Sequence, residues 1–460
     1  MSWQSIFAAM LPEHILLAGL IALIVLEIVA TRPRGSLTLS IVTVCAAAVA
    51  ALALNLAGVH ADPFPGQYAI LPGTSLAKAL VLAFALPVLL LAREERTNLR
   101  FYPLLLSSLY GFCLIVSAES FLTLFLGLEL MALPVYVLVL LGIRRPDSAE
   151  AALKYLVLGG TATALFLMGV ALLYGGAASL SLGAFATALH SNDVMARAAV
   201  VLVVAAFFVK AAIVPFHAWA PDAYEGAAVP VTAYMATIIK AGVLLAVVRL
   251  IGTEPLSRPM VDILAILPLV SIVWGNLTAM RQTSFRRMIA YSSIAHAGYL
   301  FYAFLGTGET RFQGVVFYLV AYGLANLLAF AALPRDGDDA TSDRLDHLKG
   351  LFRRRPYAAL MIGVAMLSLA GIPPFPGFIA KFLIFRNAMT AGFTTYAVLG
   401  LVGSYLGIYF YLRVIQFMFM SADEPTKAHG TVRIALAASV LCLVPIALFA
   451  LLPGFVLARL

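Results

Sequence analysis

Residues 207–242 read FFVKAAIVPFHAWAPDAYEGAAVPVTAYMATIIKAG, and this stretch decides how the chain folds. Lys210 lies in an apolar run, Pro215 follows about one turn later, and Lys240 lies in a second apolar run after a short polar loop. A lysine at the centre of a membrane helix costs about 2.5 to 3.5 kcal/mol on insertion scales. A proline inside such a helix leaves backbone groups that other atoms must satisfy. The stretch therefore predicts a break in a membrane helix that serves a function.

The whole chain has the composition of a membrane protein. Of its 460 residues, 63% are hydrophobic and 11% are charged, against roughly 45–50% and 25% in soluble domains. The formal net charge of +8 is explained by basic cytoplasmic loops and does not indicate nucleic-acid binding. The cysteines at positions 45, 113 and 442 are too far apart in sequence to predict a zinc site or a disulfide framework. The N-terminus lacks the basic region of a cleavable signal, so we expect the first helix to remain.

Apolar runs long enough to span a bilayer, about 17 to 25 residues each, recur along the chain. They predict an all-α polytopic membrane protein with about 14 transmembrane helices. The twelfth run is interrupted by GIPPFPGFIAK at residues 371–381, which predicts a second broken helix. The predicted spans are 11–30, 37–58, 75–92, 101–117, 119–143, 151–174, 196–219, 227–250, 259–280, 285–306, 311–334, 356–390, 394–420 and 431–457.

The distribution of basic residues predicts the orientation. If the N-terminus lies outside, the inside loops hold 18 Lys and Arg residues. The outside loops and ends then hold only 4, which are Arg197, Arg258, Arg311 and Arg459. Because cytoplasmic loops carry the excess of Lys and Arg, this bias places both termini outside, on the periplasmic side of a bacterial inner membrane.

The two breaks suggest an internal repeat. Lys210 lies near Pro215 in the seventh span, and Lys381 lies near Pro373, Pro374 and Pro376 in the twelfth. Five helices separate the two spans, and an odd number reverses the second copy, as in many inverted-repeat transporters. Within one membrane domain, 1–460, we therefore expect a three-helix segment at 1–100, five-helix repeats at 101–256 and 257–420, and a C-terminal helix at 421–460.

Ionisable residues within the spans are the candidate site. Five of them would together cost on the order of 10 kcal/mol if unpaired, so they must pair or line a hydrated interior. Lysine can take up and release a proton, whereas arginine stays charged, so the pattern favours a proton path. A buried salt bridge that only fixes helix packing is the alternative. The central candidates are Glu129, Lys210, Lys240, His296 and Lys381, with Lys154 about four residues inside the sixth span.

Other polar residues in the spans have weaker interpretations. His217 follows Lys210 by two helical turns and is either a proton relay or a structural residue beside Trp219. Lys78 and Arg249, like Arg386, lie near span ends, where we expect their side chains to extend to the interface without a role.

Several common motifs do not occur in the sequence. There is no GxGxxG after a strand, no P-loop and no nucleophile elbow. No histidine pair is spaced for haem and no cysteine cluster for iron–sulfur. We therefore expect no cofactor, metal or NADH site and no redox centre in this chain.

Three motifs in combination carry a resemblance to a known family. They are the 207–242 stretch, RRMIAYSSIAHAGYL at 286–300 and LAGIPPFPGFIAKF at 369–382. Together they resemble the antiporter-like membrane subunits of respiratory complex I, from about the fourth to the thirteenth span. Within that family, the length, YSSIAHAGYL and the lysine at position 381 are most similar to subunit N of bacterial NADH:quinone oxidoreductase.

The resemblance implies a role for each candidate. Glu129 would tune Lys210 of the broken seventh helix, with Lys154 beside that pair. Lys240 would be the central lysine, and His296 would lead towards the lysine of the broken twelfth helix. That residue, Lys381, would lie on the exit side, and electron transfer in other subunits would drive proton movement along the series.

The resemblance also implies the partners. FMN, iron–sulfur clusters and quinone would be held by other complex I subunits, and the neighbours would be antiporter-like and small membrane subunits within the lipid bilayer, with no nucleic acid. Two alternatives remain open. The chain could be a subunit of a Mrp-type Na⁺/H⁺ antiporter, which shares the motifs, or a non-pumping structural scaffold of a membrane complex.

Overall fold

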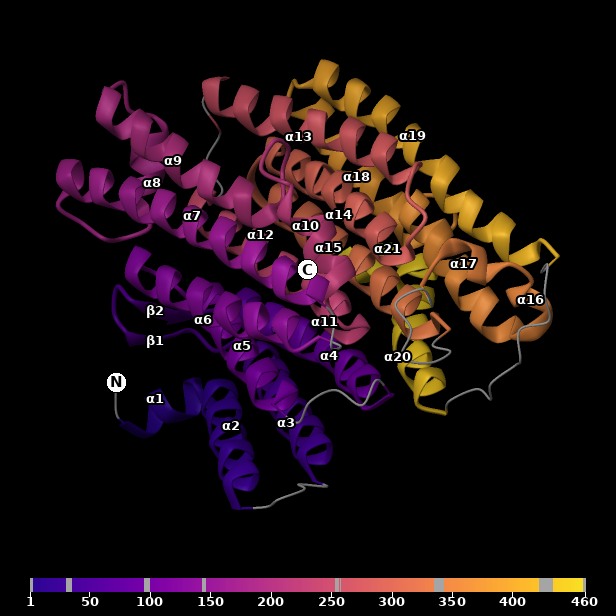
Figure 1. The fold of residues 1–460 in the computed structure, drawn as a ribbon. Helices are drawn as coiled ribbons and strands as arrows, with labels where there is room; N and C mark the ends of the chain where they lie inside the picture. The colour runs from indigo at the N-terminus through magenta and orange to yellow at the C-terminus, as the bar shows by residue number, and fades with distance from the viewer. Residues whose placement is uncertain are drawn as a thin grey trace. The chain divides into compact units, whose positions relative to one another are not determined.

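The computed structural model is almost entirely helical (Figure 1). It describes residues 3–29, 35–94, 100–142, 146–252, 256, 258–334, 343–421 and 433–457. Some of the basic residues used for the orientation lie outside the described residues, namely Arg32, Arg34, Arg96, Arg144, Arg145, Arg335, Lys427 and Arg459.

The predicted spans agree with the helices. Among the described residues, 11 helices are long and apolar enough to cross a membrane, and three shorter apolar helices cover Phe101–Val116, Pro356–Ala370 and Leu436–Leu451. Each of these helices falls in a different one of the predicted spans. The all-α membrane fold is therefore confirmed. The boundaries of the two repeats stay a prediction.

The chain divides into two compact units. Unit 1 comprises Met1–Lys210 and Ile238–Glu254, and unit 2 comprises Ala211–Thr237 and Pro255–Leu460. The chain thus passes between the units beside Lys210 and again just before Lys240.

The helices of unit 1 are α1 (Trp3–Ala9), α2 (Leu11–Val29), α3 (Ser36–Leu56), α4 (Pro72–Glu94), α5 (Phe101–Val116), α6 (Phe121–Leu140), α7 (Pro146–Ala177), α8 (Gly183–Leu189), α9 (Val194–Ala211) and α12 (Lys240–Ile251). Helix α3 packs against α2 and α4, α5 packs against α6, and α12 contacts both α5 and α6. These contacts place α6 and α12, two helices that carry candidate residues, against each other.

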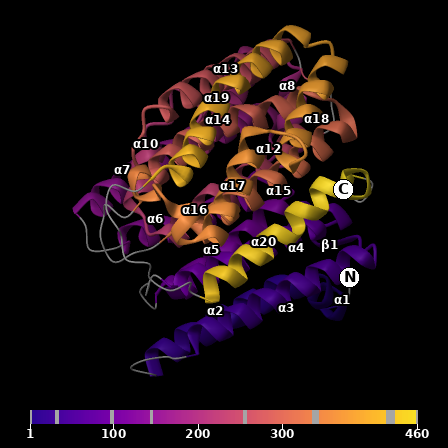
Figure 2. The ribbon, with the colours of Figure 1, turned by 90° about the vertical axis from the view of Figure 1, so that its right-hand side faces the viewer.

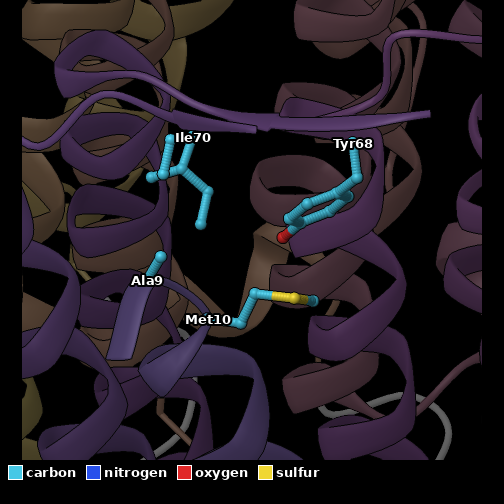
Figure 3. Close-up of a cluster of buried hydrophobic side chains, with 5 residues drawn as sticks. Ala9, Met10, Tyr68 and Ile70 are labelled. Carbon is cyan, nitrogen blue, oxygen red and sulfur yellow. The ribbon is translucent and has the colours of Figure 1, made fainter. Parts of the chain in front are cut away.

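A short antiparallel hairpin in unit 1 is the exception to the all-α prediction. Strands β1 (Ala61–Phe64) and β2 (Tyr68–Ile70) are paired after α3. Tyr68 and Ile70 pack with Ala9 and Met10 in a buried apolar cluster (Figure 3). The cluster attaches the hairpin to the junction of α1 and α2, because burial of apolar surface is favourable at roughly 25 cal/mol per Å².

The helices of unit 2 are α10 (Trp219–Gly226), α11 (Val229–Tyr234), α13 (Arg258–Ala279), α14 (Phe285–Tyr302), α15 (Gly308–Ala332), α16 (Leu351–Arg354), α17 (Pro356–Ala370), α18 (Pro376–Thr390), α19 (Thr394–Phe419), α20 (Arg433–Leu451) and α21 (Pro453–Leu457). Helix α13 packs against α14 and α19, and α15 packs against α17, α18 and α20 (Figure 2). The apolar window of α15 is fully buried, so α15 is the central helix of this unit.

Both predicted helix breaks are present. Helix α9 ends at Ala211, and no helix resumes until α10. Helix α17 ends at Ala370, Gly371 adopts a φ of +80° that favours glycine, and α18 begins at Pro376. Proline is tolerated at the start of a helix because its missing N–H has no intrahelical partner there.

The short polar loop expected between the apolar runs of Lys210 and Lys240 contains PDAYEG at residues 221–226, and the structure shows that this segment belongs to helix α10 instead. Pro221 falls in the first turn, where proline is tolerated, and Asp222 lies in the same turn, where a negative charge is favourable. A second unexpected feature is a π-helical turn at Met235–Ile239, directly before Lys240. Such turns interrupt regular α-helical hydrogen bonding and are frequent at functional sites.

Candidate functional site

Glu129 and Lys210 form an ion pair inside unit 1. Lys210 Nζ, on the last turn of α9, lies 3.3 Å from Glu129 Oε1 in the middle of α6. The Thr163 hydroxyl on α7 donates a hydrogen bond of 2.6 Å to the same oxygen. The lysine and glutamate side chains are 9% and 21% exposed. The structure therefore brings the first two predicted residues together in a largely desolvated position, and it adds a hydroxyl partner.

Lys240 is buried at the junction of the π-helical turn and α12. Its exposed fraction is 6%. Two residues later, a Cβ at Gly242 would lie 2.4 Å from Met131 Sδ, so a larger residue here would displace the Met131 side chain at this close approach of α12 to α6. Because Met131 follows Glu129 by two residues on α6, the packing ties the Lys240 helix to the helix of the ion pair.

His296 lies in the middle of α14 in unit 2 and is 3% exposed. Its Nε2 lies 3.0 Å from the Tyr411 hydroxyl of α19, and its Nδ1 lies 2.9 Å from the Tyr318 hydroxyl of α15. The Tyr411 hydroxyl is also 2.5 Å from Ser292 Oγ, one turn before His296. Both ring nitrogens therefore have hydroxyl partners on different helices.

Lys381 lies on α18 after the second break and is 7% exposed. Its Nζ donates a 2.9 Å hydrogen bond to the carbonyl of Ala370, the last residue of α17. The same Nζ lies 4.9 Å from the ring centroid of Tyr299. The broken helix thus provides a partly negative carbonyl end, and α14 provides an aromatic face; both favour a cation.

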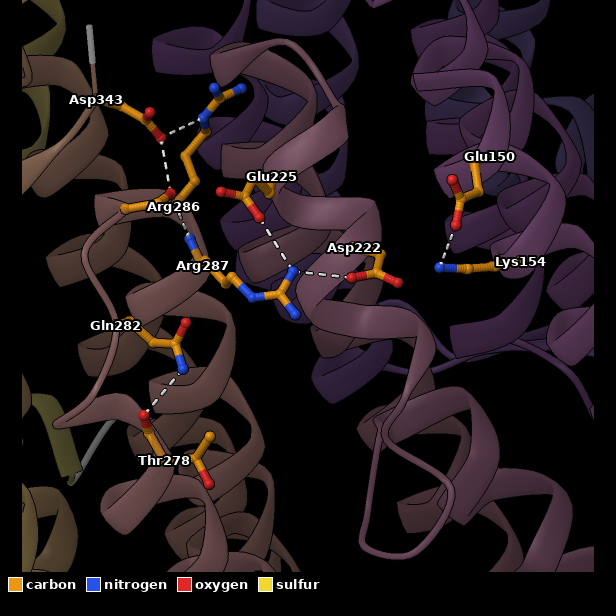
Figure 4. Close-up of polar contacts among 10 residues, drawn as sticks. Glu150, Lys154, Asp222, Glu225, Thr278, Gln282, Arg286, Arg287 and Asp343 are labelled. Carbon is orange, nitrogen blue, oxygen red and sulfur yellow. Dashed lines mark hydrogen bonds and ion pairs between the residues drawn. The ribbon is translucent and has the colours of Figure 1, made fainter. Parts of the chain in front are cut away.

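Two candidates occupy other positions than expected. The structure shows Lys154 in an ion pair of 2.6 Å with Glu150, one turn earlier on α7, with side chains 44% and 67% exposed (Figure 4). His217 lies in the loop before α10, where its Nε2 accepts a 3.1 Å hydrogen bond from Trp274. Because α9 ends at Ala211, the predicted break separates His217 from the helix that carries Lys210.

Two basic residues near span ends form ion pairs that the sequence did not predict. Lys78 is buried in an ion pair of 2.8 Å with Glu13, and Arg249 pairs with Glu119. The Tyr68 hydroxyl donates a 2.7 Å hydrogen bond to Glu13. Burial and the Glu13 carboxylate raise the pKa of Tyr68 well above its usual value, so the hydroxyl stays protonated and continues to donate.

An arginine–carboxylate network lies at the start of α14 (Figure 4). Arg287 bonds to Asp222 at 2.8 Å and to Glu225 at 3.0 Å, and both carboxylates are on α10. Arg286 pairs with Asp343 at 2.8 Å, and both side chains are 6% exposed. We did not predict these pairs. For the pairs of Arg287, the available signal was the acidic stretch 221–226 among otherwise basic loops.

The hydroxyl partners Thr163, Tyr318 and Tyr411 were also not predicted. Serines and tyrosines are frequent in these spans, and no sequence spacing shows which hydroxyl meets which ionisable group from another helix. No group of three or more His, Cys, Asp or Glu residues that could hold a metal ion occurs in the part of the chain that the structure describes.

Comparisons with known proteins agree with this geometry. Residues 118–407 match the family model described as NADH:quinone oxidoreductase/Mrp antiporter, TM. NADH-quinone oxidoreductase subunit N of Pelobacter propionicus is 37% identical over 419 residues, which cover 91% of this chain and 90% of the relative. Subunit N of Laribacter hongkongensis is 35% identical over 451 residues, which cover 94% and 91%.

Solved structures give the same result. A chain of respiratory complex I from Thermus thermophilus is 36% identical, with a TM-score of 0.84 over 97% of this chain and 98% of that chain. A chain of the Mrp complex from Dietzia sp. DQ12-45-1b has a TM-score of 0.86 over 98% and 96%, but at 22% identity this likeness concerns the fold alone. The chain is a multi-pass membrane protein that belongs to the NADH:quinone oxidoreductase/Mrp antiporter transmembrane family.

Proposed function

We propose that this chain is the subunit N of a bacterial NADH:quinone oxidoreductase and that it moves protons across the membrane. Relatives at 35% and 37% identity over nearly the whole chain carry that name. The subunit would work with other membrane subunits of the complex, whereas NADH, FMN, iron–sulfur clusters and quinone would be bound by partner subunits. The chain would lie in the inner membrane with both termini on the periplasmic side, as the excess of Lys and Arg in the inside loops favours.

The observation that carries the proposal is the largely buried Glu129–Lys210 pair at the end of α9. The negative charge of Glu129 favours the charged form of Lys210, because opposite charges within about 4 Å attract strongly in a low-dielectric environment. The pair is made by single atoms, Lys210 Nζ and Glu129 Oε1. A small displacement of α9, which ends one residue later, would separate them.

Separation of the pair would make Lys210 release its proton. The proton would pass to Lys240, whose helix packs on α6, and from the Lys240 side towards His296 and Lys381. The helix break and the π-helical turn supply backbone groups outside regular helical hydrogen bonding, where water can enter. Lys154 is in an exposed ion pair, so we assign it a position at the surface of α7 beside this path. His217, which accepts a hydrogen bond from Trp274, would be a further relay.

A Mrp-type Na⁺/H⁺ antiporter subunit is the second candidate, because that group has the same fold. The two functions differ in whether a redox reaction drives the chain. After mild solubilisation, our proposal predicts that NADH:quinone oxidoreductase activity migrates with this chain and that NADH drives proton uptake into inverted vesicles. Rescue of a sodium-sensitive strain by this chain, with no associated NADH oxidation, would favour the antiporter instead.

A further inference from the structure

We propose that Tyr318 and Tyr411 are proton-relay residues that make His296 a gate for one proton at a time. This inference rests on the proposed function, because it assumes that protons pass through unit 2. Its basis is a continuous series of hydrogen-bonding groups that runs across three helices: Tyr318 on α15, His296 and Ser292 on α14, and Tyr411 on α19.

The distances in the series are short enough for proton transfer at every step. They are 2.9 Å from Tyr318 to His296 Nδ1, 3.0 Å from His296 Nε2 to Tyr411, and 2.5 Å from Tyr411 to Ser292. All four residues are at most 3% exposed. Bulk water therefore does not solvate these hydroxyls and nitrogens, and they satisfy one another.

The chemistry of imidazole gives the series a direction. Neutral histidine has one N–H donor and one bare nitrogen acceptor, so one tyrosine must donate to the ring and the other must accept from it. In one state, Tyr318 donates to Nδ1, the Nε2–H donates to Tyr411, and Tyr411 donates to Ser292. In the other state, every hydrogen bond of the series points the opposite way.

Passage of one proton converts the first state into the second. An incoming proton binds the Tyr318 oxygen while Tyr318 gives its own proton to Nδ1. The Nε2 proton then moves to Tyr411, Tyr411 passes its proton to Ser292, and Ser292 releases its proton beyond the series. One proton enters and one leaves, and no group changes its final proton count. The ring ends as the other tautomer.

The series must be reset before a second proton can follow in the same direction. Reset requires the hydroxyls to rotate and the ring to return to its first tautomer. Tight packing slows that step, since the ring centroids of Tyr322 and Tyr299 lie 4.7 Å and 5.5 Å from that of His296. A relay that must reset would pass single protons and resist continuous leakage.

Tyrosine-to-phenylalanine variants test this mechanism, because phenylalanine keeps the packed ring and removes the hydroxyl. We would measure NADH-driven proton uptake and its solvent deuterium isotope effect in vesicles that contain the fully assembled complex. The Tyr318→Phe and Tyr411→Phe variants should each pump about tenfold more slowly, since a positioned proton carrier typically contributes roughly 10² or more to a transfer step and another step can limit the natural protein. Their isotope effect should rise, which loss of packing alone would not cause.

Tyr302→Phe is the matched control. Tyr302 lies on the same helix as His296 and is buried, but its hydroxyl has no hydrogen-bond partner among the residues that the structure describes. This variant should pump at the normal rate. Normal pumping with an unchanged isotope effect in Tyr318→Phe or Tyr411→Phe would overturn the relay.

Lys240→Met separates the two proposals. If Lys240→Met lowers the number of protons pumped per NADH while both tyrosine variants pump normally, the relay is wrong and the proposed function stands. If Lys240→Met also pumps normally, the proposed function itself fails.

Discussion

Replacing Glu129 by glutamine removes the negative charge that faces Lys210 and keeps the size of the side chain. At the observed 3.3 Å between Lys210 Nζ and Glu129 Oε1, the Coulomb attraction is about 5 kcal/mol for an effective dielectric constant of about 20. Because desolvation of the two groups offsets most of this attraction, the net contribution of a hydrogen bond to a charged group is only about 1.5–3 kcal/mol. Loss of this amount should slow proton transfer through Lys210 roughly 10- to 150-fold.

The assay is NADH-driven proton uptake, measured together with quinone reduction, in inverted vesicles that contain the assembled complex. The Glu129→Gln variant should pump slowly while the complex still assembles. Glu150→Gln is the matched control, because it removes the same charge from the exposed pair with Lys154 and should leave pumping within about fivefold of normal, as exposed pairs contribute about 0–1 kcal/mol. Normal pumping and normal quinone reduction by assembled Glu129→Gln complex would refute the reasoning.

Two further substitutions test the helix packing and the ion pairing around the site. Gly377→Ala should disrupt the second broken helix, since a Cβ at this position would lie 1.8 Å from the Ser368 carbonyl oxygen. Assembled complex should then be scarce on native gels, whereas Gly363→Ala, at a position with open space around it, should assemble normally. Equal yields of the two variants would contradict this prediction. Arg286→Ala should lower the thermal midpoint of the purified complex by several degrees, because loss of one partner of a buried ion pair costs about 3–5 kcal/mol and leaves Asp343 unpaired; an unchanged midpoint would show that the pair contributes little.

The sequence was sufficient to predict the helices and their breaks, because both depend on local chemistry. Apolar runs of fixed length predict spans, and proline interrupts a helix wherever it occurs. The segment 221–226 was misjudged because its polar residues resemble a loop, although Pro221 and Asp222 also suit the first turn of a helix. The π-helical turn at Met235–Ile239 contains no glycine or proline, so no local signal predicts it.

The sequence predicts how deep in the membrane the site residues lie, but it does not predict which residues they contact. Position along a span shows that Glu129 and Lys210 lie far from water, and the high energy of unpaired charges there predicts that they find partners. Which side chain meets which depends on the rotation and packing of several helices, and sequence spacing does not determine these. For the same reason Lys78 was expected at the interface but is buried against Glu13, and the hydroxyls around His296 were not predicted.

The number of protons pumped per NADH by complex that contains Lys240→Met tests the central claim most directly. Lys240 is buried, and methionine has an apolar side chain of similar length that cannot carry a proton. The account predicts that the variant assembles and pumps fewer protons per NADH, whereas Lys349→Met, in a connecting segment, pumps the normal number. A normal number in assembled Lys240→Met complex would contradict a proton path through these residues.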